Sequence, residues 1–114
     1  MTPAFQIDLE MVAGSAGTRE GVIWALEESQ DLNVNLVRFG TGGGVGEHVN
    51  DEVDVVFVGV SGSGFAEVNG KDHALGPKEM IFVPRGARRS TRGTSDDFAY
   101  LTVHRRQGPI QIGS

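Results

Sequence analysis

The sequence predicts an all-β protein of antiparallel strands with little helix, folded as a sandwich or barrel. Two observations lead to this prediction. Short segments in which apolar and polar residues alternate recur along the chain, and this period is typical of half-buried strands. Glycine accounts for 17 of the 114 residues and is concentrated between these segments. Short strands separated by glycine-rich turns are typical of sandwiches and barrels rather than of helical folds.

The N-terminal residues 1–20 are predicted to form an arm. Within segment 5–12 the apolar residues Phe5, Ile7 and Leu9 alternate with polar residues. Because alternate side chains of a strand lie on the same face, this spacing predicts a strand in the arm.

Two strands are predicted next, over 22–29 and 32–39, with a turn at 29–31 that would join them as a hairpin. Period two is clear in the second of them. Several helix formers in the first leave open a short helix over 19–28 instead.

Segment 53–62 is apolar on both alternating faces, so it is expected to be covered on both sides, by the core and by a partner sheet or subunit. Asn69 and Gly70 then form the strongest hairpin signal in the chain, because both positions of a type I′ turn need positive φ. Strands are also predicted over 79–83 and 98–105. The whole chain, 1–114, is expected to form a single domain with its barrel core over 32–105.

The composition narrows the classes of partner. The formal net charge of −5 argues against general binding of nucleic acid or of anionic membranes, which requires a positive field. The absence of cysteine excludes disulfides, thiolate nucleophiles and cysteine-ligated zinc. The start MTPAFQIDLEMVAG has neither a basic end nor an unbroken apolar run, so no signal peptide and no membrane span is predicted, and a cytoplasmic location is expected.

A family resemblance is carried by two segments. The glycine-rich stretch GTGGGVG leads into His48-x-Asn50 and an apolar strand, and FVPRG at 82–86 follows the Asn69-Gly70 hairpin. This order resembles the two-motif core of the cupin superfamily, whose members are double-stranded β-helix or jelly-roll barrels. The resemblance extends over roughly residues 32–105 and implies a conserved barrel.

The resemblance also implies where a metal would lie. In metal-binding cupins, two histidines and a glutamate of the first motif and a histidine of the second hold one divalent ion. Here His48 matches the first histidine, but Asn50, Val55 and Arg89 stand at the other three positions. A guanidinium stays protonated and offers only donors, so Arg89 is not a metal ligand. We therefore expect that the site has lost the metal.

The favoured prediction is a barrel that binds a small polar or anionic molecule without a metal. Arg89, with His48 and Asn50 opposite and with His104 nearby, would form the ligand pocket. A planar guanidinium with adjustable polar neighbours is suited to a carboxylate or phosphate.

The alternative is a small metal-dependent enzyme of the oxygenase or isomerase type. A shift of one residue in the strand would put Asp54 in the place of the glutamate, and His104 could add a second imidazole. His48, Asp54 and His104 would then hold Fe, Mn, Ni or Zn. A metal-free isomerase with His48 or His104 as general base is also compatible with the sequence, so catalytic residues are not assigned.

Three points stay open in the sequence. His104 reaches the interior only if its face of the last strand, rather than that of Leu101 and Val103, points inward. The arginines Arg88, Arg89 and Arg92 could instead hold the barrel mouth together through salt bridges to nearby acidic residues, with Arg88 and Arg92 on or near a turn. A homodimer, formed through the apolar strand and the N-terminal arm, is compatible with every one of these functions.

Overall fold

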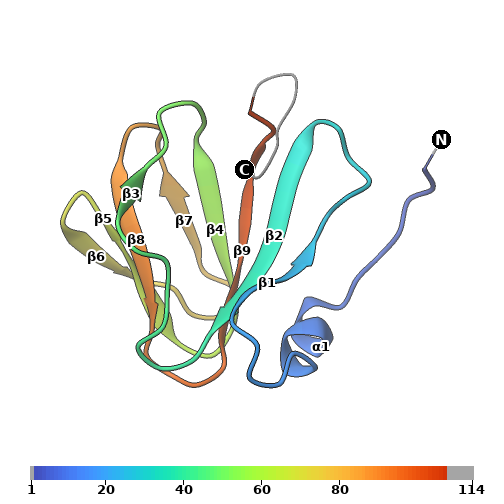
Figure 1. Cartoon of the computed structure of the whole chain (residues 1–114), viewed down its shortest axis with the longest axis horizontal. Helices are drawn as coiled ribbons and strands as arrows, with labels where there is room; N and C mark the ends of the chain where they lie inside the picture. Colours follow the sequence, from blue (N-terminus) through green and yellow to red (C-terminus); the bar gives the residue numbers. More distant parts are fainter. Residues whose placement is uncertain (1, 108–114) are drawn as a thin grey trace.

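The computed structural model describes residues 2–107 and contains one short helix and nine strands in that range. Figure 1 shows their arrangement. The elements, in chain order, are α1 (Leu9–Gly14), β1 (Gly21–Ala25), β2 (Leu32–Phe39), β3 (His48–Val49), β4 (Val55–Ser61), β5 (Gly64–Val68), β6 (Lys71–Ala74), β7 (Met80–Val83), β8 (Arg88–Gly93) and β9 (Phe98–Arg105).

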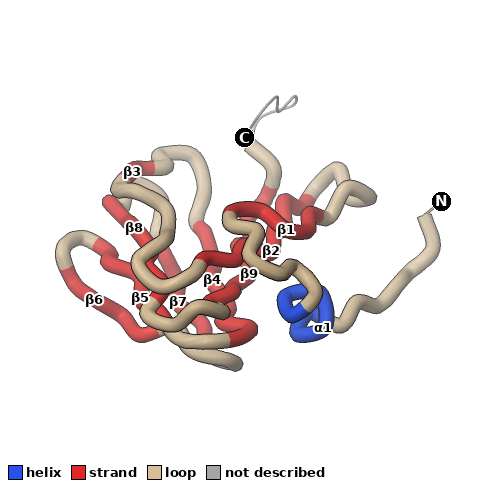
Figure 2. Tube along the Cα trace, turned by 60° about the horizontal axis from the view of Figure 1, so that its bottom comes forward, coloured by secondary structure: helices blue, strands red, loops and turns tan. Residues whose placement is uncertain are grey.

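The strands form two antiparallel sheets that face one another (Figures 1 and 2). One sheet has five strands in the order β1-β2-β9-β4-β7, and the other has four in the order β3-β8-β5-β6. Because alternate side chains of each strand point between the sheets, the main core forms there. Its largest fully buried members include Tyr100, Phe98 and Leu75. The prediction of an antiparallel all-β barrel with little helix is confirmed.

Most of the predicted strands are present. β2 and β9 have the bounds that alternation predicted, and they pair along their whole length from Leu32 opposite Arg105 to Phe39 opposite Phe98. Asn69 and Gly70 have φ of 50° and 82° and connect β5 to β6, as expected for a type I′ turn. The alternative helix over 19–28 is wrong, because β1 pairs with β2 there.

The strand predicted over 5–12 is also wrong, because this segment contains α1. The Asp8 side chain accepts a hydrogen bond of 3.0 Å from the backbone N–H of Met11 and so caps the helix. Leu9, Val12 and Ala13 form the apolar face of the helix and pack against the outer face of the five-stranded sheet. No helix in residues 2–107 is long and apolar enough to cross a membrane.

β4 is covered on both faces, as its composition indicated, although not in the predicted way. Val55 and Phe57 pack in the core between the sheets. On the opposite face, Val60 packs with Leu36 in a second cluster that includes α1. Part of the outer cover of β4 is therefore a helix of the same chain rather than a partner sheet or subunit.

Candidate functional site

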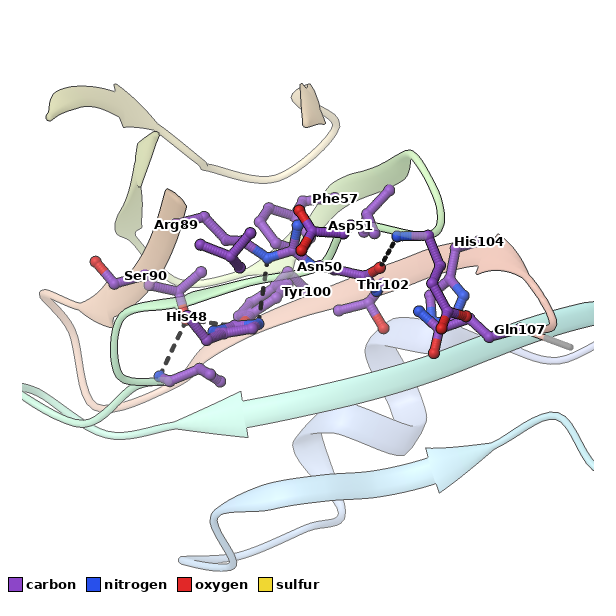
Figure 3. Close-up of a pocket in the computed structure, with 15 residues that line it drawn as sticks. His48, Asn50, Asp51, Phe57, Arg89, Ser90, Tyr100, Thr102, His104 and Gln107 are labelled. Carbon is purple, nitrogen blue, oxygen red and sulfur yellow. Dashed lines mark hydrogen bonds between the residues drawn. The ribbon is translucent and has the colours of Figure 1, made fainter. Parts of the chain in front are cut away.

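A cavity of about 570 Å³ lies between the two sheets. β4 contributes apolar walls through Val55 and Phe57, whereas β3, β8 and β9 contribute polar side chains (Figure 3). A cavity of this volume, with apolar walls and a few polar groups, is typical of a small-molecule site.

β8 brings Arg89 into this cavity. The sequence placed Arg88 and Arg92 on or near a turn, and both lie toward the ends of β8, close to the turns that flank this strand. Along β8 the residues alternate, with Arg89 and Thr91 buried and the two flanking arginines exposed. The inward position of Arg89 agrees with the predicted pocket, but the strand that carries it was not predicted, because the segment is rich in arginine and poor in apolar residues.

The alternative of salt bridges at the barrel mouth is not found as predicted. In the described part of the chain, Arg88 pairs with Glu47 at 3.5 Å, and both side chains are largely exposed. Arg92 instead lies over the ring of Phe65, 5.7 Å from its centroid. Arg89 makes no ion pair with any carboxylate in that part of the chain. An exposed salt bridge such as that between Arg88 and Glu47 contributes little to stability.

His48 and Arg89 stand directly opposite one another where β3 pairs with β8. The Arg89 Nε–H donates a hydrogen bond of 3.2 Å to His48 Nε2 (Figure 3). His48 Nδ1–H donates to the carbonyl oxygen of Gly46 at 2.9 Å. Since Nε2 accepts and Nδ1 donates, the ring is the neutral Nδ1–H tautomer. Both ring nitrogens are therefore engaged, and His48 holds the guanidinium in position.

The Arg89 side chain is a buried cation. The residue is 5% exposed. Its Nη1 atom is buried and has no hydrogen-bond acceptor within residues 2–107. Desolvation lowers the pKa of the guanidinium from its usual value. A buried donor without an acceptor costs roughly 1–3 kcal/mol, and more if the group is charged, so the protein retains an unfavourable arrangement here.

Asn50 has a different role from the one the sequence indicated. Its Oδ1 atom accepts hydrogen bonds from the backbone N–H groups of Glu52, at 2.9 Å, and Val53, at 3.2 Å. This arrangement is typical of an Asx turn, which shapes the loop at the rim of the cavity. The residue lines the cavity, but only its amide nitrogen remains for a ligand.

The inward face of β9 carries Tyr100, Thr102 and His104, which all line the cavity. Leu101 lies on the other face and packs in the cluster that includes α1. The question that the sequence left open is thus settled in favour of the polar face.

The neighbouring strand β2 extends this polar face with two asparagines. Asn33 lies opposite His104 and is 6% exposed, and Asn35 lies opposite Thr102. The Asn35 Nδ2 atom donates a 2.7 Å hydrogen bond to Asn33 Oδ1. Sequence reasoning missed these inward asparagines, because alternation shows two faces without saying which one is inside.

Comparison with protein-family models gives no match, and neither does comparison with curated protein sequences. Solved structures do resemble this one. A Klebsiella pneumoniae protein with a double-stranded β-helix domain superimposes with a TM-score of 0.74 at 13% identity, over 95% of this chain and 95% of that one. A cupin protein from Bacteroides fragilis gives a TM-score of 0.62 at 19% identity, over 74% and 73% of the two chains. The chain has the cupin fold.

A third similar structure is KdgF from Halomonas sp., with a TM-score of 0.68 at 18% identity over 75% of this chain and 77% of that one. Likeness at such identities establishes a cupin barrel and nothing about its chemistry, because one fold carries many activities. The resemblance in the sequence is confirmed for the fold.

The cupin barrel does not bring together the three residues of the metal alternative. Asp54 is not among the residues that line the cavity, and its carboxylate accepts a 2.9 Å hydrogen bond from the backbone N–H of Arg85. Both nitrogens of His48 are engaged, and the Arg89 cation lies beside it. Residues 2–107 contain no group of three His, Asp or Glu side chains placed to hold a metal ion. The side chains at this site therefore do not fit a divalent-metal centre.

Tyr100 closes the inner end of the cavity. The Tyr100 hydroxyl lies 2.7 Å from Thr91 Oγ1, and its ring packs edge-on against Phe57 with the centroids 5.3 Å apart. Burial raises the pKa of the Tyr100 phenol to about 12. The phenol is therefore neutral under all ordinary conditions and can act as a hydrogen-bonding group.

This pKa can be measured directly, because Tyr100 is the only tyrosine in the chain. We expect phenolate absorbance to rise with a midpoint near pH 12 in the folded protein and near pH 10 in concentrated denaturant. Above pH of about 10 the unfolded chain releases the proton first, so the free energy of unfolding should fall by about 2–3 kcal/mol by pH 12. Tyr100→Phe should remove this decrease. A folded-state midpoint near 10 would contradict the buried environment.

Proposed function

We propose that this cupin barrel binds a small organic anion, in the first place a carboxylate, through Arg89 and without a metal. The observation that carries the proposal is the buried Arg89 guanidinium, which lines the cavity and makes no ion pair with a carboxylate of the described chain. An anionic ligand would supply the missing counter-charge.

The geometry of the guanidinium favours a carboxylate. Its Nε–H is already donated to His48. Neither terminal nitrogen donates a hydrogen bond within residues 2–107, and Nη1 is buried. A carboxylate would meet the guanidinium where Arg89 lines the cavity. Because the group is already desolvated and held by His48, a ligand would gain a charge-assisted hydrogen bond without ordering a flexible arginine.

Two acidic residues that line the same cavity, Asp51 and Glu52, do not cancel this effect. Both are exposed, and neither forms an ion pair with Arg89. Water and salt screen exposed charges far more than buried ones. The buried cation therefore dominates at short range, and the rim carboxylates limit how much negative charge a ligand can carry.

Calorimetric titration of the wild-type protein tests the proposal. Propanoate, hexanoate and benzoate should each bind at least about tenfold more tightly than the neutral amide of the same acid, because only the carboxylate meets the buried cation. Prior treatment with EDTA should leave these affinities unchanged. Equal affinity of the acids and amides, or binding that EDTA abolishes, would overturn the proposal.

The outer face of the five-stranded sheet supports a second proposal, that the protein forms a homodimer. Met80 and Phe82 on β7 are 62% and 55% exposed and point outward. Each of them begins a row of apolar side chains that continues on the neighbouring strand β4, because Phe82 pairs with Val56 and Met80 with Val58. α1 packs on the other end of this face and leaves these rows without a cover from the described chain.

A second copy of the chain is the partner that fits this surface best. A contiguous apolar area on a sheet face is typical of an interaction surface, and a two-fold axis would bring two identical faces together. At the opposite edge of the same sheet, the N-terminal segment lies outside the two sheets (Figure 1) and leaves Phe5 53% exposed beside β1. We infer that the two outer faces pack against each other.

A further inference from the structure

The cavity has a second polar end, which the anion site does not use. His104 and Gln107 lie together on the opposite side of the cavity from Arg89 and His48 (Figure 3). Thr102 lies between these two groups. A ligand that reached both ends would be recognised at two points, and their chemistry can be derived separately.

The strands set the offset between the two ends. The contact between Thr91 and Tyr100 joins β8 and β9 at the inner end of the cavity. Arg89 lies one two-residue repeat beyond Thr91, and His104 lies two such repeats beyond Tyr100. Since one repeat is roughly 7 Å long, His104 is about 7 Å further toward the rim than Arg89. The two groups are therefore far enough apart to lie at opposite ends of one small ligand.

His104 offers a hydrogen-bond acceptor at this end. Its Nδ1–H donates to the carbonyl oxygen of Arg105 at 2.7 Å, so Nε2 of the neutral ring keeps its lone pair. No residue in 2–107 forms a hydrogen bond with that nitrogen. His48 differs, because the Arg89 guanidinium already occupies its Nε2. The free imidazole acceptor of the cavity is thus that of His104, and its complement is a hydroxyl or N–H donor.

The exposed carboxylates of Asp51 and Glu52 disfavour a second anionic group at the His104 end. The backbone carbonyl of Glu52 accepts a 3.1 Å hydrogen bond from Arg105, which places the acidic loop next to His104. Asp51 and Glu52 also line the cavity. A carboxylate at this end would meet carboxylates of the protein, whereas a neutral donor would not.

We propose, building on the anion site above, that the ligand is a hydroxy-substituted monocarboxylic acid with an apolar middle. Its carboxylate binds Arg89, its hydroxyl donates to Nε2 of His104, and its middle packs against Val55 and Phe57. This assignment names the class of ligand and gives His104 the role of choosing among carboxylates.

Four benzoates of fixed shape test the proposal by calorimetry on the full chain. para-Hydroxybenzoate should bind about tenfold more tightly than benzoate, the difference expected for one hydrogen bond. para-Methoxybenzoate, which has no donor, and terephthalate, which has a second carboxylate, should gain nothing. His104→Leu should reduce the affinity for para-hydroxybenzoate to that for benzoate and leave benzoate itself unchanged. His73→Leu, on β6 outside the cavity, is the matched control and should change neither affinity.

The two-ended site, in which Arg89 binds the carboxylate and His104 binds the hydroxyl of one ligand, is contradicted by any of the following results. Equal binding of para-hydroxybenzoate and para-methoxybenzoate, or tighter binding of terephthalate, would overturn the two-ended site. An equal loss for benzoate and para-hydroxybenzoate in His104→Leu would show a structural role for His104 and would also overturn it. If none of the four binds, the two-ended site is wrong as well. The anion site is judged separately, by the comparison of acids with amides and by its dependence on Arg89.

Discussion

Arg89→Met is expected to weaken the binding of benzoate and hexanoate by at least about 30-fold, on the order of 2 kcal/mol or more. The variant keeps a side chain of similar length at a position that is 5% exposed, but it removes the charge and the donors. The affinity for the neutral amides should hardly change, because they gain little from a cation. Calorimetric titration of both ligand types measures the two effects.

The same variant should leave the free energy of unfolding unchanged or raise it by about 1–3 kcal/mol, because it removes a buried charge and its unpaired donor. Denaturant unfolding without ligand measures this effect. Arg88→Met on the same strand is the matched control, since Arg88 is exposed and pairs with Glu47. That control should change neither quantity by much. A strongly destabilised Arg89→Met protein would mean that Arg89 serves the fold. The loss of binding would then not show that Arg89 contacts the ligand.

Phe82→Asp is expected to convert the proposed dimer to a monomer, raising the dissociation constant by about 100-fold or more. The substitution puts a charge on the edge strand, at the exposed end of one apolar row, without disturbing the core, because Phe82 is 55% exposed and points away from it. Sedimentation equilibrium over a range of protein concentrations measures the change.

Phe65→Asp is the control for this prediction. Phe65 lies on β5, in the four-stranded sheet, beside the buried Ala66 and on the opposite face from it. This variant should keep the mass of the wild-type protein in solution. A wild-type protein that is already monomeric at high concentration would refute the dimer, and equal dissociation by both variants would point to a general loss of folding.

Much of the fold could be predicted from local sequence patterns. The bounds of β2 and β9 follow from alternation of apolar and polar residues, and the β5–β6 hairpin follows from Asn69-Gly70. The order of the two motifs led to the cupin barrel, which the solved structures support. These features are local, so the sequence alone was sufficient to recognise them.

The errors arose where neighbours in space decide the outcome. Segment 5–12 alternates like a strand, yet the Asp8 cap and an apolar face that packs on Leu36 make it a helix. β8 was missed because its segment lacks the apolar residues by which a strand is recognised, and its pairing with β3 and β5 shows that it is one.

For the candidate site, the sequence by itself determined which groups were available. His48, Asn50, Arg89 and His104 all line one cavity, and Arg89 stands where the resemblance would put a metal ligand. Only the tertiary structure decided their roles. Hydrogen bonds turn Asn50 to its own loop, join His48 to Arg89 and leave His104 with a free acceptor. Spacing along a chain fixes which side chains share a face, whereas hydrogen bonds depend on atoms that folding brings together from distant segments.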